Sequence, residues 1–336
     1  MKILYDRRWE GMDGIGRISH AVNRFLKDRT DLELLYVRKE KIRYLTDPIY
    51  LSMEINRHQP DLYFSPGFNP PVFANAPFVF TICDLIPLFV PELWKARKAL
   101  YYNSVVRRAG RKASGILTIS EYSREEIIQW GNFLPEKVHA VHLAAGEAFA
   151  PVGNVYKNPK PYYLYVGNHS PHKNVRRLLQ AFARSGLNRE FDLLLAGMPV
   201  GYWLERIREL GMAESIKELG FMPDRDLPSL YRGAFCFVFP SLYEGFGLPP
   251  LEAMACGTPV VVSNAASLPE VVGEAGIYVN PVEVESIADG LARMADSSIN
   301  SEFARKGLKQ SGRFSWEITT GKIWSILQNA AGYGND

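Results

Sequence analysis

Short apolar runs alternate with longer amphipathic stretches along the whole chain. The runs are rich in aromatic and β-branched residues, as is typical of strands buried on both faces of a parallel sheet. In the first half of the chain they lie at residues 2–5, 32–37, 61–65, 78–83 and 115–120. The stretches between them have helical spacing, and one helix is expected from about residue 17 to residue 27, after a glycine-containing loop at 10–16. This alternation predicts a doubly wound α/β fold.

A proline-containing break at residues 151–161 divides this pattern in two. After the break the alternation resumes, with apolar runs at 162–167, 191–196, 215–220, 234–240 and 259–263. A chain of 336 residues is also longer than a typical single domain of about 100–150 residues. We therefore predict an N-terminal domain over residues 1–155 and a C-terminal domain over residues 156–313, followed by a helix at about 314–331.

The composition is that of an ordinary globular protein, with 47% apolar and 22% charged residues. The amino terminus is charged from Lys2 onward and lacks the apolar core of a signal peptide. No run approaches the ~18 apolar residues of a membrane span. Cys83, Cys236 and Cys256 have apolar neighbours and form no C-x-x-C pattern, which favours reduced thiols over a disulfide or zinc framework. These features predict a cytoplasmic protein.

The small net charge of +3 is unevenly distributed along the chain. Residues 1–150 contain 21 lysines and arginines against 17 acidic residues, whereas residues 151–336 contain 18 against 19. Much of the surplus lies in the predicted helix from Lys95 to Lys112, which has no acidic residue. Such a helix either presents a solvated basic face above a buried apolar stripe or lies on an anionic membrane. A nucleic acid partner is not expected, because no motif for one accompanies the charge.

The most informative stretch is Y-E-G-F-G-L-P-P-L-E-A-M-A-C-G-T-P at residues 243–259. It follows a buried apolar run and leads into a predicted helix that begins near two prolines. Gly245 and Gly247 therefore fall in a strand-to-helix turn, where free N–H groups and the helix dipole favour an anion. Glu244 and Glu252 would offer carboxylates to the hydroxyl groups of a polyol. The residues alone also allow a simpler interpretation, in which one glutamate is a helix-dipole charge and the other a solvated helix residue.

The fuller pattern, which continues as V-V-V-S, resembles the donor-site signature of the retaining family 4 glycosyltransferases. The resemblance implies the GT-B fold, in which two Rossmann-like doubly wound domains face each other across a cleft. It also implies that the C-terminal helix crosses back to the N-terminal domain. In this family the first glutamate and the following backbone approach the donor sugar and its phosphates, and the second glutamate holds the ribose hydroxyls. By position, these roles fall on Glu244, on Gly245, Phe246, Gly247 and Leu248, and on Glu252.

A second predicted strand-to-helix loop reads V-G-N-H-S-P-H-K-N at residues 166–174. Glycine together with a compact lysine charge suits a diphosphate. The loop resembles the family's V-G-R/T-x4-K-N motif, which implies that Gly167, Asn168 and Lys173 bind the phosphates. Many members have an arginine where this chain has Asn168. The resemblance therefore leaves more of the charge stabilisation to Lys173, with Arg176 or Arg177 as further candidates.

A bound metal is not expected. His169 and His172 have no carboxylate or cysteine at ligand spacing beside them. An Asp-Arg-Asp triplet that ends at Asp226 spells D-x-D, but we expect Asp226 to cap a helix instead. The preceding L-G-F-M-P resembles the family's L-G-F/Y-x-P, whose backbone passes the nucleotide base, and this implicates Phe221 and Met222. No cofactor is predicted, since the nucleotide-sugar would be a substrate.

Two motifs of the first domain complete the resemblance. Gly14-Ile-Gly16-Arg17 lacks the third glycine of a dinucleotide fingerprint, so an NAD site is not favoured. It resembles the family's G-I-G-R-Y loop, which faces the donor phosphates and the acceptor. T-I-C-D-L-I-P resembles T-V-H-D-L-I-P, with Cys83 in place of the histidine that approaches the reacting sugar and with Asp84 retained. The resemblance therefore places Arg17, Cys83 and Asp84 on the acceptor side.

These motifs together predict a retaining, metal-independent hexosyltransferase with Glu244, Lys173 and Asp84 as its catalytic residues. The T-I-C-D-L-I-P and V-H-L-A-A-G-E-A-F motifs are closest to bacterial mannosyltransferases that build surface polysaccharide, which favours GDP-mannose as donor and a growing or lipid-linked glycan as acceptor. UDP- and ADP-hexose donors remain open. A non-catalytic subunit that binds sugar nucleotides and a nucleotide-sugar 2-epimerase are the alternatives of other classes.

Overall fold

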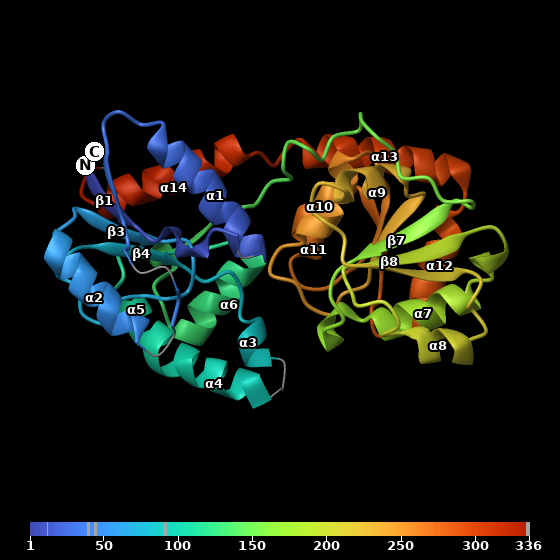
Figure 1. Cartoon of the computed structure of the whole chain (residues 1–336), viewed down its shortest axis with the longest axis horizontal. Helices are drawn as coiled ribbons and strands as arrows, with labels where there is room; N and C mark the ends of the chain where they lie inside the picture. The colour runs from blue at the N-terminus through green and yellow to red at the C-terminus, as the bar shows by residue number, and fades with distance from the viewer. Residues whose placement is uncertain (12, 39–40, 44–45, 90–92, 334–336) are drawn as a thin grey trace. The chain divides into compact units, whose positions relative to one another are not determined.

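The computed structural model describes residues 1–11, 13–38, 41–43, 46–89 and 93–333, except for the side chains of residues 13 and 93–96. It divides into two compact units (Figure 1). The first unit consists of Met1–Leu143 together with Trp316–Asp336, and the second is Ala144–Ser315. The predicted domain boundary followed residue 155, so residues 144–155 lie in the second unit of the structure.

The first unit is built on a six-stranded parallel sheet of order β2-β1-β3-β4-β5-β6. Its strands are short and mostly buried, and side chains such as Leu4, Tyr63 and Phe80 join one hydrophobic core. The strands are β1 (Lys2–Tyr5), β2 (Glu33–Tyr36), β3 (Leu62–Ser65), β4 (Phe78–Thr81), β5 (Gly115–Thr118) and β6 (Val138–Ala140). Strand β6 was not predicted, because it is a three-residue edge strand whose central residue, His139, is only half-buried.

Helices flank this sheet, and α1 and α14 lie side by side against it (Figure 1). The basic stretch forms α4, a π-helical turn and α5 in succession, with the side chain of Lys95 outside the described part. The helices are the 3-10 helix η1 (Arg7–Trp9), α1 (Asp13–Lys27), α2 (Asp47–His58), α3 (Ile86–Phe89), α4 (Leu93–Tyr101), the π-helix η2 (Tyr102–Val106), α5 (Arg107–Lys112), α6 (Glu121–Gly131), the 3-10 helix η3 (Pro135–Lys137) and α14 (Trp316–Ala330).

Helix α14 belongs to the first unit although it comes last in the chain. It contacts α1, β3 and β4. Thr319 donates a hydrogen bond from Oγ1 to the carbonyl oxygen of His142 at 2.6 Å, and the ring of Trp324 packs 6.4 Å from that of Phe25. The Arg29 guanidinium lies over both rings, 4.1 Å from the Trp324 centroid and 5.8 Å from the Phe25 centroid. The chain therefore returns to its first unit to complete that unit's core.

The second unit has its own six-stranded parallel sheet, of order β12-β11-β10-β7-β8-β9. Counted from β7, this is the classical 3-2-1-4-5-6 order of doubly wound folds. The strands are β7 (Tyr162–Val166), β8 (Asp192–Ala196), β9 (Ile216–Gly220), β10 (Cys236–Phe239), β11 (Val260–Ser263) and β12 (Gly276–Val279). Strand β12 was not predicted, because its G-I-Y-V run is short and opens on a glycine.

Helices cover both faces of the second sheet. In Figure 1, α9, α10 and α13 lie on one side of β7 and β8, and α7, α8 and α12 lie on the other. Packing of α10 against α9 and α13, and of α12 against α7, agrees with this division. The helices are the 3-10 helix η4 (Pro171–Lys173), α7 (Val175–Arg184), the 3-10 helix η5 (Leu187–Arg189), α8 (Leu204–Glu209), α9 (Leu227–Gly233), α10 (Leu248–Ala255), α11 (Leu268–Val272), α12 (Val284–Met294) and α13 (Ser297–Ser311).

In each sheet, successive strands are added first on one side of the first strand and then on the other. The place where this order reverses is called the switch point, and open α/β sheets bind ligands there. In the first unit the reversal lies between β1 and β3, and in the second it lies between β7 and β10. The prediction of two Rossmann-like domains is confirmed.

Among the helices of the described ranges, none combines the length and apolarity needed to span a lipid bilayer.

Candidate functional site

The turn after β10 carries Glu244 into the switch point of the second unit. The Ser267 hydroxyl holds this turn by hydrogen bonds to the carbonyl oxygens of Glu244 at 2.9 Å and Phe246 at 2.7 Å. Gly247 precedes α10 with a positive φ of 114°, and a Cβ there would lie 2.7 Å from a methyl group of Leu268. Only glycine fits this position, because both the backbone angle and the space exclude a side chain.

Lys173 and Glu244 meet at this switch point although 71 residues separate them in sequence. The Lys173 ammonium lies 2.7 Å from Oε1 and 2.9 Å from Oε2 of Glu244, and 5.0 Å from the ring centroid of Phe239. The two side chains are 14% and 9% exposed. A cation and a carboxylate are therefore paired at the strand ends and keep limited access to solvent. The sequence assigned them separate roles and did not predict their contact.

The loop that carries Lys173 is fixed by Asn174. This residue adopts the left-handed conformation with φ of 62°, and its amide group donates to the carbonyl oxygens of Pro240 at 2.9 Å and Pro281 at 2.6 Å. The backbone N–H of Leu242 donates to the carbonyl oxygen of His172 at 2.7 Å. These bonds tie the loop after β7 to the loops after β10 and β12. The buried side chain of Asn174 therefore fixes the loop that positions Lys173.

Gly167 and Asn168 open the same loop. A Cβ on Gly167 would lie 2.7 Å from the hydroxyl of Tyr165, and that hydroxyl donates to the carbonyl oxygen of Asn168 at 3.0 Å. The Asn168 side chain is exposed, and its Oδ1 accepts from the backbone N–H of Ser170 at 3.0 Å. Arg176 and Arg177 were further candidates for charge stabilisation. Arg177 donates a hydrogen bond from Nη1 to Oδ1 of Asn174 at 2.9 Å, so its side chain supports the loop.

Glu252 lies in α10 and is buried. Its Oε2 accepts a hydrogen bond from the Tyr231 hydroxyl of α9 at 3.2 Å. A solvated helix residue would not lie in this position, so the simpler interpretation of Glu252 is wrong. A buried carboxylate with a hydroxyl partner is a group able to accept hydrogen bonds from ligand hydroxyls.

The amino end of α10 offers few backbone donors. Pro249 and Pro250 occupy the positions after Leu248 in the first helical turn, and neither has an N–H group. Backbone donors for an anion are therefore confined to Gly245, Phe246, Gly247 and Leu248. The Phe246 side chain is buried against Phe314, with ring centroids 5.8 Å apart, so this ring packs inside the second unit and does not face a ligand.

Phe221 and Met222 follow the last residue of β9. The Phe221 side chain is 84% exposed. Asp226 occupies the N-cap position of α9, as predicted, although its side chain makes no capping hydrogen bond. Within the described ranges no three His, Cys, Asp or Glu side chains gather as a metal ion would require.

In the first unit, α1 begins four residues earlier than predicted. Gly14 and Gly16 therefore lie in its first turn and not in a preceding loop. A Cβ on Gly16 would come within 3.0 Å of the backbone nitrogen of Gly11, so this glycine permits the chain to fold closely over the start of the helix. Arg17 follows in the same turn and is half-buried.

Cys83 and Asp84 come just after β4, at the edge of the first sheet that is formed by the carboxyl ends of its strands. Asp84 accepts the backbone N–H of Ile86 on its Oδ1 at 3.0 Å, at the start of α3. Burial, and secondarily the Asp84 carboxylate, raises the pKa of the Cys83 thiol well above its usual range. A thiol whose pKa is raised in this way is a poor nucleophile.

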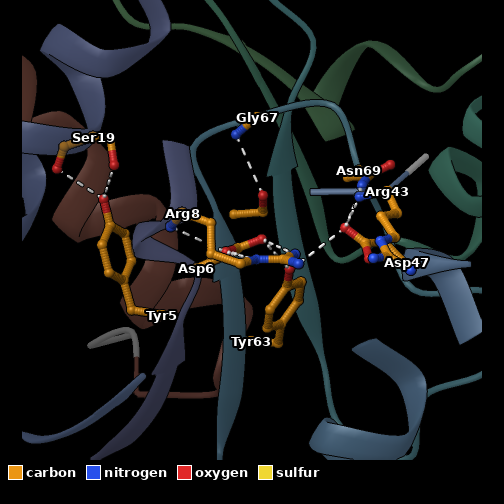
Figure 2. Close-up of polar contacts among 10 residues, drawn as sticks. Tyr5, Asp6, Arg8, Ser19, Arg43, Asp47, Tyr63, Gly67 and Asn69 are labelled. Atoms are coloured by element: carbon orange, nitrogen blue, oxygen red, sulfur yellow. Dashed lines mark hydrogen bonds and ion pairs between the residues drawn. The ribbon is translucent and has the colours of Figure 1, made fainter. Parts of the chain in front are cut away.

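A buried ionic network at the first unit's switch point was missed by the sequence analysis (Figure 2). The Arg8 guanidinium binds Asp6 through Nε–Oδ1 and Nη2–Oδ2, each at 2.7 Å, and reaches Asp47 at 2.9 Å. The same Asp47 oxygen accepts from the amide of Asn69 at 3.1 Å. Burial lowers the pKa of Arg8, but its bonds and charge pairing with Asp6 outweigh this and raise that pKa above the ordinary value.

Part of this network could have been predicted from the sequence. Asp6 and Arg8 directly follow a buried strand, where charged side chains must find partners. Their partner Asp47 opens α2 and is 39 residues away from Arg8 in sequence, and no local spacing connects them. The predicted residues Gly14, Gly16, Arg17, Cys83 and Asp84 share the first unit with this network, and the other predicted site residues lie in the second.

Comparison with known proteins matches both halves of the chain. The family model described as glycosyl transferases group 1 matches residues 150–313, and the model described as glycosyltransferase family 4 matches residues 21–145. The O-antigen chain mannosyltransferase B of Escherichia coli is 37% identical over 276 residues, which cover 77% of this chain and 72% of that protein. The serotype-specific mannosyltransferase WbdA of Escherichia coli is 32% identical over 71% of this chain but only 32% of its own length.

The two parallel sheets, the strand-end ion pair and these matches define a glycosyltransferase. The chain belongs to glycosyltransferase family 4. Among solved structures, the sucrose-phosphate synthase of Thermosynechococcus elongatus superposes with a TM-score of 0.78 at 17% sequence identity and covers 98% of both chains. This likeness concerns the fold, which is GT-B.

Proposed function

We propose that this protein transfers mannose from GDP-mannose to a hydroxyl group of a growing surface-polysaccharide precursor. The relatives whose names specify mannose support the sugar. The observation that carries the proposal is the Lys173–Glu244 pair at the switch point of the second unit. It supplies a cation for a diphosphate and a carboxylate for sugar hydroxyls within one contact.

The paired state of Lys173 bears directly on donor binding. With no donor, its charge is satisfied by Glu244 and by the face of Phe239. A diphosphate that enters beside Gly245 would share the ammonium, and the Glu244 oxygens so released would accept hydrogen bonds from the hexose. Binding of the phosphates would thereby prepare the carboxylate for the sugar, and this exchange favours a complete nucleotide-sugar over either part alone.

The chemical step requires charge stabilisation at the departing phosphate. The bond from the anomeric carbon to the phosphate oxygen breaks, the acceptor oxygen bonds to the same face of that carbon, and the acceptor proton passes to the leaving phosphate. This front-side transfer retains the anomeric configuration. Negative charge grows on the diphosphate as the bond loosens, and Lys173 and the backbone N–H groups of residues 245–248 would stabilise it. On this basis we propose that catalysis needs no metal ion.

A panel of nucleotide-sugars tests the donor. We expect GDP-mannose to raise the melting temperature more than UDP-glucose, UDP-N-acetylglucosamine or ADP-glucose does, since bound ligand stabilises the folded state. GDP release should depend on an added mannoside acceptor, and NMR of the product should give an α-linkage. Preference for a UDP-sugar would contradict the donor assignment. Loss of activity with EDTA, restored by Mn²⁺, would contradict metal independence.

We further propose that the enzyme lies at the cytoplasmic face of a membrane through its basic helical segment. Among the described side chains of α4 and α5, the solvent-exposed cations are Arg97, Arg108, Arg111 and Lys112. The apolar side chains of Leu100 and Phe89 are exposed in the same region of the chain. Cations interspersed with exposed apolar groups suit an anionic lipid surface. A lipid-linked acceptor would then meet the enzyme at the membrane.

Vesicle co-sedimentation tests this surface. We expect binding to vesicles that contain phosphatidylglycerol and little binding to neutral phosphatidylcholine vesicles. Arg108→Glu with Arg111→Glu should abolish the binding, whereas the matched pair Arg305→Glu with Lys309→Glu on α13 of the second unit should not. Equal binding by both double variants would contradict the assignment.

A further inference from the structure

A cavity of about 500 Å³ lies in the first unit, at the amino ends of β3 and β4. It is formed by the end of α2, by the loops that lead into the two strands and by the chain after α14. The candidate site residues of this unit follow the carboxyl ends of its strands, so the cavity lies at the opposite edge of the sheet. Pockets that bind small ligands have volumes of about 300–1,000 Å³. The proposed reaction makes no use of this cavity.

Tyr333 lines the cavity and is fixed in place. Helix α14 is followed by Gly332 in the left-handed conformation, with φ of 77°, and the N–H of Tyr333 donates to the carbonyl oxygen of Gln328 at 2.8 Å. The Tyr333 hydroxyl donates to Oδ2 of Asp61 at 3.1 Å, which also accepts the backbone N–H of Lys2 at 2.7 Å. The residue is thus held by its backbone and by its hydroxyl, yet is 50% exposed. A ring held in this way binds a ligand at little entropic cost.

Gln59 lines the same cavity in a backbone conformation that glutamine rarely adopts. It follows α2 with φ of 45° and ψ of 57°, in the left-handed region, where glycine or asparagine is usual at the end of a helix. A longer side chain in this region costs free energy of folding. The Gln59 side chain is exposed, and no hydrogen bond joins its amide to the rest of the chain as described. A strained residue whose side chain supports nothing in the fold is a candidate for ligand binding.

Two further side-chain amides line the cavity. Asn56 accepts the backbone N–H of Asn75 on its Oδ1 at 3.1 Å, and its amide nitrogen donates to no other described residue. The exposed side chain of Asn75 also makes no hydrogen bond within the described ranges. Together with Gln59, these residues offer uncharged donors and acceptors. Asp61 supplies the one charged group among the described lining residues.

The lining chemistry favours one class of ligand. None of the described lining residues is a lysine, an arginine or a histidine, and Asp61 would repel an anion, so a nucleotide or a phosphate is disfavoured. Strands β3 and β4 are each paired on both sides, so neither offers a free edge to an extended peptide. Amides and a carboxylate suit the hydroxyl groups of a sugar, and an exposed aromatic face suits its C–H groups. A neutral sugar ring therefore fits the cavity best.

We propose that this cavity is a second carbohydrate site, which binds a sugar residue of the glycan chain away from the place of transfer. Strands β3 and β4 have four residues each, which separate the two edges of the sheet by about 13 Å or more. Only a glycan of several sugars could therefore occupy both sites at once, so the cavity distinguishes long acceptors from short ones. The choice of mannose in the probe rests on the proposed function, whereas the site itself does not.

Gln59→Gly tests the site in the full-length protein. Glycine relieves the left-handed backbone, so the melting temperature should not fall. Loss of the amide should raise the dissociation constant for a manno-oligosaccharide by about 2- to 12-fold, the equivalent of one hydrogen bond. Titration without donor, followed by NMR at the side-chain amide of Asn75 in isotope-labelled protein, measures binding at this cavity alone. Asn132→Gly is the matched control, because Asn132 is also exposed and left-handed, with φ of 50° at the end of α6, but does not line the cavity.

Kinetics give a second measurement. In Gln59→Gly the KM for a long manno-oligosaccharide acceptor should rise, whereas the KM for a monosaccharide acceptor and the dissociation constant for GDP should not change. Equal dissociation constants for Gln59→Gly and Asn132→Gly would overturn the proposal, as would an Asn75 resonance that responds to GDP or inorganic phosphate and not to the oligosaccharide. If no donor supports mannosyl transfer, the proposed function fails. Oligosaccharide binding at Asn75 that Gln59→Gly weakens would still support the cavity as a carbohydrate site, and absence of that binding overturns it.

Discussion

Each of the two switch points contains an ion pair, but the two ion pairs differ in charge balance and in exposure to solvent. In the first unit one guanidinium faces two carboxylates, and the side chains of Arg8, Asp6 and Asp47 are at most 2% exposed (Figure 2). In the second unit one ammonium faces one carboxylate, and both keep contact with solvent. A surplus of buried carboxylates repels an incoming anion, whereas a balanced and accessible pair can share its cation. The fold supplies the same location twice, and local charge distinguishes the proposed phosphate site from the network that holds the chain together.

The largest effect is expected from Arg8→Met. Removal of the guanidinium leaves Asp6 and Asp47 buried without a cation, which should lower the free energy of unfolding by about 3–5 kcal/mol. Urea unfolding followed by circular dichroism measures this change. Lys306→Met breaks an exposed pair with Glu302 and should cost at most about 0.5 kcal/mol. A similar small change for Arg8→Met would show that the network is not structural.

Lys173→Met should act on catalysis instead. Loss of the cation at the developing phosphate charge should reduce kcat/KM for transfer about 10²- to 10³-fold, with the far-ultraviolet circular dichroism unchanged. Lys217→Met is the matched control, because Lys217 pairs with Asp192 at 2.5 Å on the same sheet but away from the switch point. Wild-type kinetics for Lys173→Met would remove this lysine from the site and end the contrast between the two units.

Glu252→Ala should weaken donor binding by about 1–3 kcal/mol, since a charge-assisted hydrogen bond to the nucleotide is lost. Calorimetric titration with GDP gives the dissociation constant. Tyr231→Phe removes only the hydroxyl partner of Glu252 and should have a smaller effect. If the two variants weaken binding equally, the carboxylate acts through Tyr231 and does not contact the ligand itself.

The smallest expected effect is a change in how the free energy of unfolding depends on pH, and it concerns His139 in the edge strand of the first sheet. Burial, and then the charges of Arg124 and Lys322, lower the pKa of His139 below its ordinary 6.5. The unfolded chain therefore binds a proton more readily, so this residue's contribution to stability is present above about pH 6.5 and is lost as the pH falls through its folded pKa. His139→Gln should flatten the dependence of unfolding free energy on pH between 5 and 7. An unchanged slope would contradict the assignment.

Sequence reasoning worked where a pattern is local. The apolar runs located β1, β7 and β10 to within a residue or two, and the helix predicted at about 314–331 is α14. It failed at α1, because the glycines that signal a loop here tolerate the first turn of a helix and permit close packing on Gly11. It also failed at β6, where three residues give too short a pattern.

The site was predicted as separate residues and not as an arrangement. Motif positions singled out Lys173 and Glu244, but their contact depends on how the loops after β7 and β10 are tied together by Asn174. The Arg8 network was missed for the same reason, because its partner Asp47 is placed beside it only by the fold. The prolines after Leu248 were predicted to lie in the first turn of a helix, and α10 includes them there.

The return of α14 to the first unit has a consequence for the order of events during synthesis. The second unit is continuous from Ala144 to Ser315, so all its strands and helices are translated before α14. The first unit must wait for α14 to cover β3 and β4. The N-terminal half of this enzyme is thus expected to mature last, and a premature stop codon before Trp316 would damage the half of the protein that was made first.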